Sequence, residues 1–198
     1  MSVGTILYSD SLGTSQVAID SVEIKNRILW VDDDVSPTLI NQLIRKISLL
    51  SLENSKQPIK LCINTDGGSI EDGLALYDVI VNSTVPIYTL VVARAYSMGG
   101  ILLSAGTKRF ALSHSRIMLH QARINQISGG TENDVDEYVK NLRYFDNILV
   151  DILAKRTDKS IKEIKKTISY DHYFTAEEAK DFNLIDDIIT LDAFINLA

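Results

Sequence analysis

Short apolar segments alternate with stretches of helical periodicity through the first 120 residues, and this alternation most narrows the possible folds. Apolar runs of strand length are separated by segments whose apolar side chains recur every three or four positions. Strands that alternate with helices form βαβ units with right-handed crossovers and a largely parallel sheet. The sequence therefore predicts an α/β fold. The expected strands are 28–31, 59–63, 86–92, 109–112 and 116–119, and the expected helices are about 36–50, 70–81 and one that begins near residue 97.

The second half of the chain is dominated by one long amphipathic segment. Apolar side chains from Val135 to Ile152 step by three and four, which predicts a helix over Asn133–Arg156 with a continuous apolar seam. Further apolar residues extend this seam to more than one side of the helix. Such a helix must pack against more than one neighbour, so we expect part of it to contact another subunit.

Local signals place the remaining elements. Ser160 with Glu163, and Thr175 with Glu178, have the spacing of a helix capping box, so a helix is predicted to begin at each pair. Asn183 then suits a left-handed helix end. A last strand is predicted over residues 184–189.

The composition excludes several classes of function. The net charge is −6, whereas a nucleic-acid surface needs clustered Lys and Arg to neutralise phosphates. Cys62 is the only cysteine, so neither an intrachain disulfide nor a cysteine metal cluster can form. No apolar run has the length of a membrane span, and no signal-peptide pattern is visible. We therefore expect a cytoplasmic protein that needs no metal or other cofactor and binds neither nucleic acid nor membrane.

A lone serine stands between two apolar segments in the stretch AYSMGG, residues 95–100. The first backbone N–H groups of a helix are unpaired and can bind an anion. Ser97 could therefore be a nucleophile beside donors that hold a developing oxyanion. Gly67 and Gly68, after an earlier strand, offer a second accessible N–H. Ser97 could equally be an ordinary helix N-cap, since serine is common at that position.

A nucleophilic serine needs a base, and the chain has three histidines. His120 ends a predicted strand, where active-site residues of α/β sheets tend to lie. His114 lies in a predicted turn, and His172 follows Asp171. Asp171 could orient an imidazole or be an ordinary loop residue. These alternatives stay open on the residues alone.

Three motifs together resemble the proteolytic subunits of the Clp protease (ClpP), a family of serine peptidases. INTDGGSIEDGLALYD, residues 63–78, is similar to the family's glycine loop and the helix after it. Residues 95–121, AYSMGGILLSAGTKRFALSHSRIMLHQ, resemble its nucleophile helix and histidine strand. YFTAEEAKDFNLID, residues 173–186, resembles its C-terminal signature. The motifs follow the family's order with closely similar spacing, and the resemblance covers about residues 24–189.

The resemblance implies a Ser-His-Asp serine endopeptidase. Ser97 matches the nucleophile, His120 the general base and Asp171 the acid that orients the imidazole. Gly68 and Met98 match the oxyanion-hole donors, through their backbone N–H groups. The subunit itself would hydrolyse peptide bonds without ATP.

The resemblance also implies a crotonase/ClpP-like α/β fold of repeated β-β-α and βαβ units with a projecting handle helix. Residues 21–198 would form a single peptidase domain with the handle at about 131–156, and residues 1–20 a flexible N-terminal arm that could form an axial gate. Family members form heptameric rings that stack to a tetradecamer around a proteolytic chamber. An AAA+ unfoldase normally feeds them unfolded protein or peptides.

The chain departs from the family's usual pattern around the expected substrate groove. Ala122 stands where proline is usual, before the segment 123–128 that should accept an extended peptide as an edge strand. Asp66 replaces a common proline in the glycine loop. The cleavage preference of this chain is therefore expected to differ.

Further departures affect assembly. Ser169 and Tyr170 replace an acidic–arginine pair that bridges the two rings, and Lys60 and Cys62 replace aromatic residues of the unfoldase-docking pockets. The N-terminal arm does not match the family's pattern either. These departures indicate a divergent member, such as a second paralogue or a phage- or plasmid-encoded copy.

Two alternatives to an active peptidase stay open. The chain could be a catalytically weak or inactive structural subunit of mixed rings with an active ClpP paralogue. It could also be a crotonase-type acyl-CoA enzyme, which shares the fold and an oxyanion hole, because a fold does not imply a function.

Overall fold

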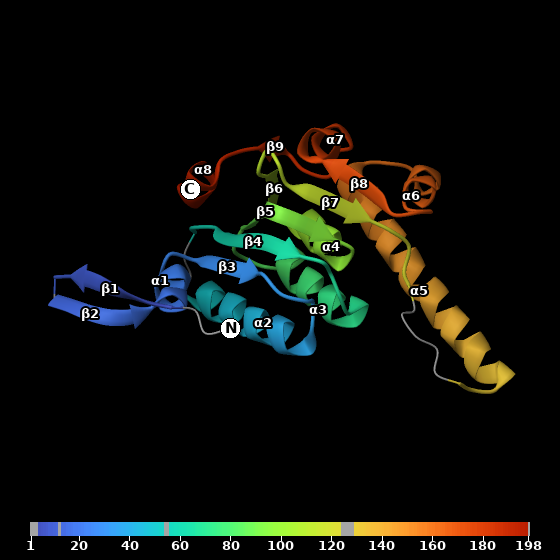
Figure 1. Ribbon diagram of the computed structural model, residues 1–198, viewed down its shortest axis with the longest axis horizontal. Helices are drawn as coiled ribbons and strands as arrows, with labels where there is room; N and C mark the ends of the chain where they lie inside the picture. Colours follow the sequence, from blue (N-terminus) through green and yellow to red (C-terminus); the bar gives the residue numbers. More distant parts are fainter. Residues whose placement is uncertain (1–3, 12, 54–55, 124–128, 198) are drawn as a thin grey trace.

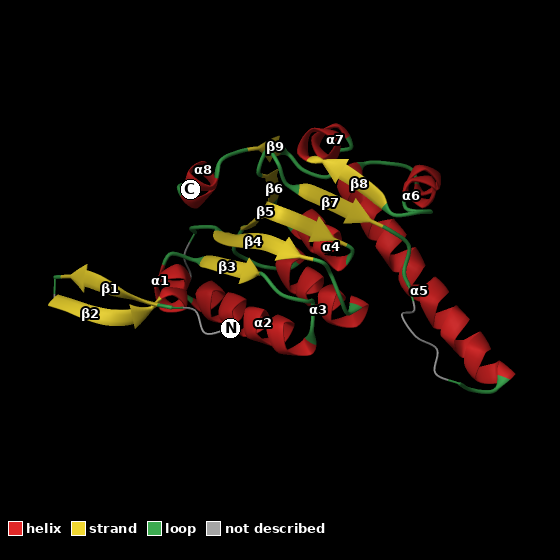
Figure 2. Ribbon diagram, viewed as in Figure 1, coloured by secondary structure: helices red, strands yellow, loops and turns green. Residues whose placement is uncertain are grey.

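The computed structural model describes residues 4–11, 13–53, 56–123 and 129–197, which form one main sheet with helices and a separate two-stranded hairpin (Figures 1 and 2). The predicted α/β class is confirmed. None of the helices in these residues is long and apolar enough to span a membrane.

The strands are β1 (Thr5–Asp10), β2 (Gly13–Ala18), β3 (Ile28–Val31), β4 (Ile59–Thr65), β5 (Ile87–Tyr96), β6 (Lys108–Ala111), β7 (Arg116–Leu119), β8 (His172–Thr175) and β9 (Asp187–Ile188). The helices are α1 (Ile19–Lys25), α2 (Pro37–Leu52), α3 (Ile70–Val81), α4 (Met98–Ala105), α5 (Glu132–Thr157), α6 (Ile161–Thr167), α7 (Ala176–Asp181) and α8 (Leu191–Ile195).

The main sheet is largely parallel, as predicted. Its strand order is β3-β4-β5-β6-β9, with β7 paired to β5 and β8 paired to β7. Among the described strand pairs of this sheet, only β7–β8 is antiparallel. The crossovers through α3 and α4 are the βαβ units that the alternation of apolar runs predicts.

The long central strand β5 pairs with β4 along one edge and divides the other edge between two neighbours. Residues 88–91 pair with β6, whereas residues 94–96 pair with β7. The end of β5 is therefore adjacent to β7 rather than β6. This division brings the residue after β5, Ser97, beside the strand that leads to His120.

Apolar side chains cover both faces of the sheet, because alternate residues of a strand point to opposite faces. Leu61 and Ile63 of β4 belong to the main core, which α2, α3 and α4 cover. Cys62 belongs to a smaller cluster on the other face, with Leu90, Phe110 and Phe194 of α8. This two-sided burial explains why β4 and β5 are continuous apolar runs.

Helix α5 projects from the body of the molecule (Figure 1). A capping box between Thr131 and Asp134 begins it, and Asp158 ends it with a left-handed φ of 58°. Its buried residues lie only in the second half, at Leu149, Val150, Leu153 and Thr157. The first half exposes apolar and aromatic side chains: Val135, Tyr138 and Tyr144.

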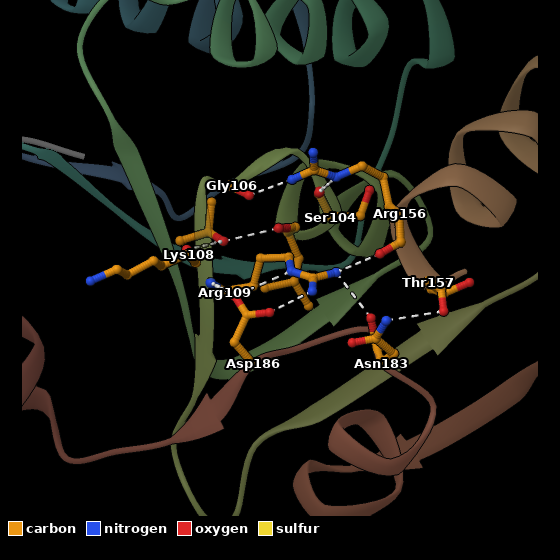
Figure 3. Close-up of polar contacts among 10 residues, drawn as sticks. Ser104, Gly106, Lys108, Arg109, Arg156, Thr157, Asn183 and Asp186 are labelled. Carbon is orange, nitrogen blue, oxygen red and sulfur yellow. Dashed lines mark hydrogen bonds and ion pairs between the residues drawn. The ribbon is translucent and has the colours of Figure 1, made fainter. Parts of the chain in front are cut away.

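A network of partly buried arginine contacts fixes the base of α5 (Figure 3). The Arg109 guanidinium of β6 donates to the carbonyls of Arg156 and Asn183 at 2.8 and 2.9 Å and forms an ion pair with Asp186. Arg156 in turn donates to the carbonyls of Ser104 and Gly106. These contacts connect the C-terminal ends of α4 and α5, and so they hold the helix that follows Ser97.

Two regions differ from the sequence prediction. Residues 5–10 and 13–18, assigned to the flexible arm, pair as the antiparallel strands β1 and β2. In the predicted last strand, only Asp187–Ile188 pair as β9. Leu184 instead donates its N–H to the Ala179 carbonyl at 2.8 Å, because Asn183 is left-handed as predicted and turns the chain back onto α7.

Candidate active site

The turn between β5 and α4 holds Ser97 in a backbone conformation that non-glycine residues rarely adopt, with φ 54° and ψ −119°. Its N–H donates to the Met118 carbonyl of β7 at 2.8 Å. Its side chain makes no capping hydrogen bond. By contrast, Ser36, Ser69 and Ser160 are extended or near-extended and cap their helices through the hydroxyl. The structure therefore excludes the side-chain N-cap interpretation of Ser97.

The glycine loop after β4 packs directly against this turn. Gly67 has a φ of +105°, and a Cβ built there would lie 2.7 Å from the Ser97 Cβ and 2.8 Å from the Tyr96 carbonyl oxygen. No side chain fits this space. The Gly67 N–H donates to the Thr65 hydroxyl at 3.1 Å, which fixes the loop from within. The absence of a side chain thus lets two segments about 30 residues apart meet at Ser97.

The two residues predicted to form the oxyanion hole line the same cavity as Ser97. Gly68 and Met98 line a pocket of about 300 Å³ together with Ser97 and His120. Met98 is the first residue of α4, where an N–H has no partner within the helix. Within the described ranges, neither N–H donates a hydrogen bond. Both are therefore available to an oxyanion.

His120 follows β7 and is half-buried in this pocket. Its Nδ1 contacts the Gln121 carbonyl, which can only accept, so Nδ1 carries the proton and Nε2 keeps its lone pair. Burial lowers the pKa of His120; the Gln121 contact opposes this shift, and the Arg123 charge adds to it. A lowered pKa keeps the imidazole neutral near pH 7, which is the form that a general base needs.

Asp171 lies just before β8. The antiparallel register of β7 and β8 ends at the pair Leu119 and His172, so His120 and Asp171 are the next residues along their two chain segments. Yet the Asp171 carboxylate forms an ion pair with Arg123. Among the residues that the structure describes, no hydrogen bond joins His120 to Asp171 or to the Ser97 hydroxyl.

Other potential nucleophiles and bases lie elsewhere. Cys62 is fully buried in β4, where burial, with a smaller effect of Glu23, raises the pKa of its thiol to about 12. His114 is exposed and contacts the Ser113 hydroxyl at 3.3 Å. The His172 ring packs against Phe174, with 4.4 Å between ring centroids. Neither of these histidines lines the Ser97 pocket.

The structure thus brings together four of the five predicted site residues, Ser97, His120, Gly68 and Met98, in one pocket. Asp171 is adjacent in the sheet but has another partner. Arg123 was not predicted as a site residue, because nothing in its local sequence indicates that it reaches Asp171 from 48 positions away. Gly67 could have been singled out, since a double glycine after a strand often marks a close approach of two backbones.

Two of the residues that depart from the family pattern, Ala122 and Lys60, make hydrogen bonds to other elements. The Ala122 N–H donates to Asp146 of α5 at 3.2 Å, and the expected groove residues 124–128 lie outside the described residues. Lys60 donates to the Ile195 carbonyl of the C-terminal helix. Tyr170 is 85% exposed beside Asp171.

Comparison with known proteins identifies the family. The family model described as Clp protease matches residues 12–192. The chain belongs to the Clp protease family. It is 38% identical over 170 residues to ATP-dependent Clp protease proteolytic subunit 2 of Corynebacterium glutamicum. The aligned region covers 85% of this chain and 84% of the relative. It is 36% identical over 179 residues to the proteolytic subunit 2 of Tropheryma whipplei, which covers 89% of this chain and 98% of the relative.

The family assignment confirms the predicted resemblance, fold and class of enzyme, a serine endopeptidase. Membership of the Clp protease family also associates the chain with a Clp protease complex. The acyl-CoA alternative has no support from these comparisons.

Proposed function

We propose that this chain cleaves peptide bonds with Ser97 as nucleophile, His120 as general base and Asp171 as the acid that orients the imidazole. The observation that carries the proposal is the turn at Ser97, where the hydroxyl caps no helix and shares a pocket with two residues whose N–H groups have no partner among the described residues. His120 Nε2 would take the Ser97 proton during attack and return it to the leaving amine. Gly68 and Met98 would stabilise the oxyanion.

The natural substrates are proposed to be unfolded proteins or peptides, cut inside a ring-shaped oligomer. The exposed half of α5 supports the oligomer, because Val135, Tyr138 and Tyr144 are 40%, 48% and 61% exposed and would be buried against a second subunit. We further propose heptameric rings that stack to a tetradecamer, an AAA+ partner that supplies ATP-driven unfolding, and a cytoplasmic location. The single buried thiol of Cys62 suits a reducing compartment.

The test is covalent labelling with a fluorophosphonate serine probe, read by intact mass. Wild type should gain one adduct and hydrolyse a fluorogenic peptide, whereas Ser97→Ala should gain none and lose at least about 10³-fold in kcat. Size-exclusion chromatography should show the same oligomer for both proteins. Full hydrolysis by Ser97→Ala would overturn the proposal.

A second candidate function is a structural subunit of mixed rings with an active ClpP paralogue. The observation that favours it is the ion pair of Asp171 with Arg123, which leaves the His120 imidazole without its acid. This candidate predicts no probe adduct on the isolated chain and recovery of activity only when a paralogue co-assembles.

A further inference from the structure

The short segment after His120 is tied to two different elements. The Gln121 N–H donates to the Ile168 carbonyl at 3.0 Å, and the Ala122 N–H donates to the Asp146 carboxylate of α5 at 3.2 Å. These bonds direct Arg123 toward the loop before β8, where its guanidinium pairs with Asp171. The hydrogen bonds of these two backbone N–H groups therefore set the position of Arg123.

Both members of the expected His–Asp pair have substitute partners here. The Gln121 carbonyl accepts from His120 Nδ1, and Arg123 takes the Asp171 carboxylate. The carbonyl can fix the imidazole tautomer, but it carries no full charge to stabilise an imidazolium. An unassisted His120 would therefore be a weaker base in the transition state than one paired with Asp171.

The Arg123–Asp171 ion pair is open to exchange. The side chains are 52% and 34% exposed, and ion pairs at such exposure are weak. His120 and Asp171 follow the last paired residues of β7 and β8, and the charge of Arg123, which holds Asp171, also acts on the His120 ring. Arg123 also lines the Ser97 pocket and a neighbouring one beside α5, which gives its guanidinium room once it releases Asp171.

We propose that Arg123 is a positioning residue that competes with His120 for the Asp171 carboxylate, so that the triad is complete only in molecules in which Arg123 has released Asp171. The inference rests on the proposed function of Ser97, His120 and Asp171. The competition involves no covalent step. It sets the fraction of subunits that can react, and so it acts on kcat rather than on peptide binding.

The first experiment compares steady-state hydrolysis of a fluorogenic peptide by wild type, Arg123→Gln and Arg123→Lys. Arg123→Gln should raise kcat about two- to fivefold with an unchanged KM, the range that an exposed ion pair supports. Lysine keeps the charge of arginine but not its bidentate geometry, so the kcat of Arg123→Lys should lie between those of wild type and Arg123→Gln. The matched control is Arg45→Gln, an exposed arginine of α2 that should leave both constants unchanged.

A double-variant cycle separates competition from a structural role. In an Asp171→Asn background, Arg123→Gln should no longer raise kcat, because the contested carboxylate is gone. A fall in kcat with Arg123→Gln, a change in KM alone, or the same increase in both backgrounds would overturn the proposal.

A readout without hydrolysis keeps the inference separate from the proposed function. In a Ser97→Ala background with ¹³C-labelled histidine, NMR titration should show that Arg123→Gln raises the pKa of His120, since the lowering charge is lost and Asp171 can pair with the ring. Among the charged residues that the structure describes, Asp66 lines the same pocket, and Asp146 accepts a hydrogen bond from the Ala122 N–H.

The increase in the His120 pKa should be larger with Asp171 present than in the Asp171→Asn background. Equal increases in the two backgrounds would show only the loss of a nearby charge and would reject the competition. If hydrolysis does not depend on Ser97, the proposed function fails, while this titration still decides whether Arg123 and His120 compete.

Discussion

Ser97 and Asp171 are proposed members of one triad, but different forces hold them in place. The Ser97 turn is enclosed by the glycine loop, by β7 and by α4, which is buried along its whole length. Asp171 lies at the surface and is held by one partly exposed ion pair. Close packing allows a single arrangement, whereas a solvated ion pair exchanges easily. The Ser97 turn is therefore fixed by the packing of the core, whereas the Asp171 side chain can exchange its ion-pair partner.

The largest effect should come from disturbing the packed half. Gly67→Ala places a methyl group 2.7 Å from the Ser97 Cβ, so the turn must shift. A shift of about 1 Å at a reacting atom costs about 10²-fold or more in rate, and we expect a loss of at least that size in kcat/KM for peptide hydrolysis. Gly13→Ala is the matched control, because Gly13 also has a positive φ but has open space around it. Equal activity of the two variants would contradict the packing argument.

Disturbing the acid half should have an effect no larger than this, and on kcat alone. Asp171→Asn keeps the size of the side chain but removes the charge that stabilises an imidazolium, so we expect kcat to fall about 10²-fold with little change in KM. Stability should change little, because the ion pair with Arg123 is partly exposed. Chemical denaturation of the variant checks this second point. Wild-type kcat in Asp171→Asn would show that this carboxylate is not part of the working site.

The pH dependence of hydrolysis should report His120. Burial lowers the pKa of this imidazole, so its neutral form persists below the ordinary value of about 6.5. The neutral ring is the active base, and kcat/KM should therefore rise with pH, reach half its maximum below pH of about 6.5 and be flat near neutrality. A midpoint above that value would show that His120 is already paired with Asp171 in the free enzyme.

The smallest expected effect is on the free energy of unfolding, and it should distinguish a serine that caps a helix from Ser97. Ser36 accepts a hydrogen bond from the Leu39 N–H at the start of α2, so Ser36→Ala should lower the free energy of unfolding by about 1 kcal/mol and leave kcat unchanged. Ser97→Ala should show the reverse, lost activity with little change in the urea midpoint, because the hydroxyl caps nothing. A large stability loss in Ser97→Ala would mean that this side chain has a structural role.

The sequence predicted most of the architecture because the relevant signals are local. The ends of β3, α3 and β7 agree with the prediction, since apolar periodicity and turn residues define them. The hairpin β1–β2 and the short helices α1 and α8 were not predicted. Their apolar faces are narrow, and their pairing or packing depends on the rest of the chain.

By itself, the sequence determined the family, the parallel α/β core, the candidate residues and the long projecting helix. These follow from apolar periodicity and from motifs that are each contiguous in the chain. Only the tertiary structure decided that the Ser97 hydroxyl caps no helix, that Gly67 packs against the Ser97 turn, and that Arg123 pairs with Asp171. Each of these facts is a contact or an absent contact between segments far apart in sequence. Such contacts depend on how the elements pack, and no local pattern encodes them.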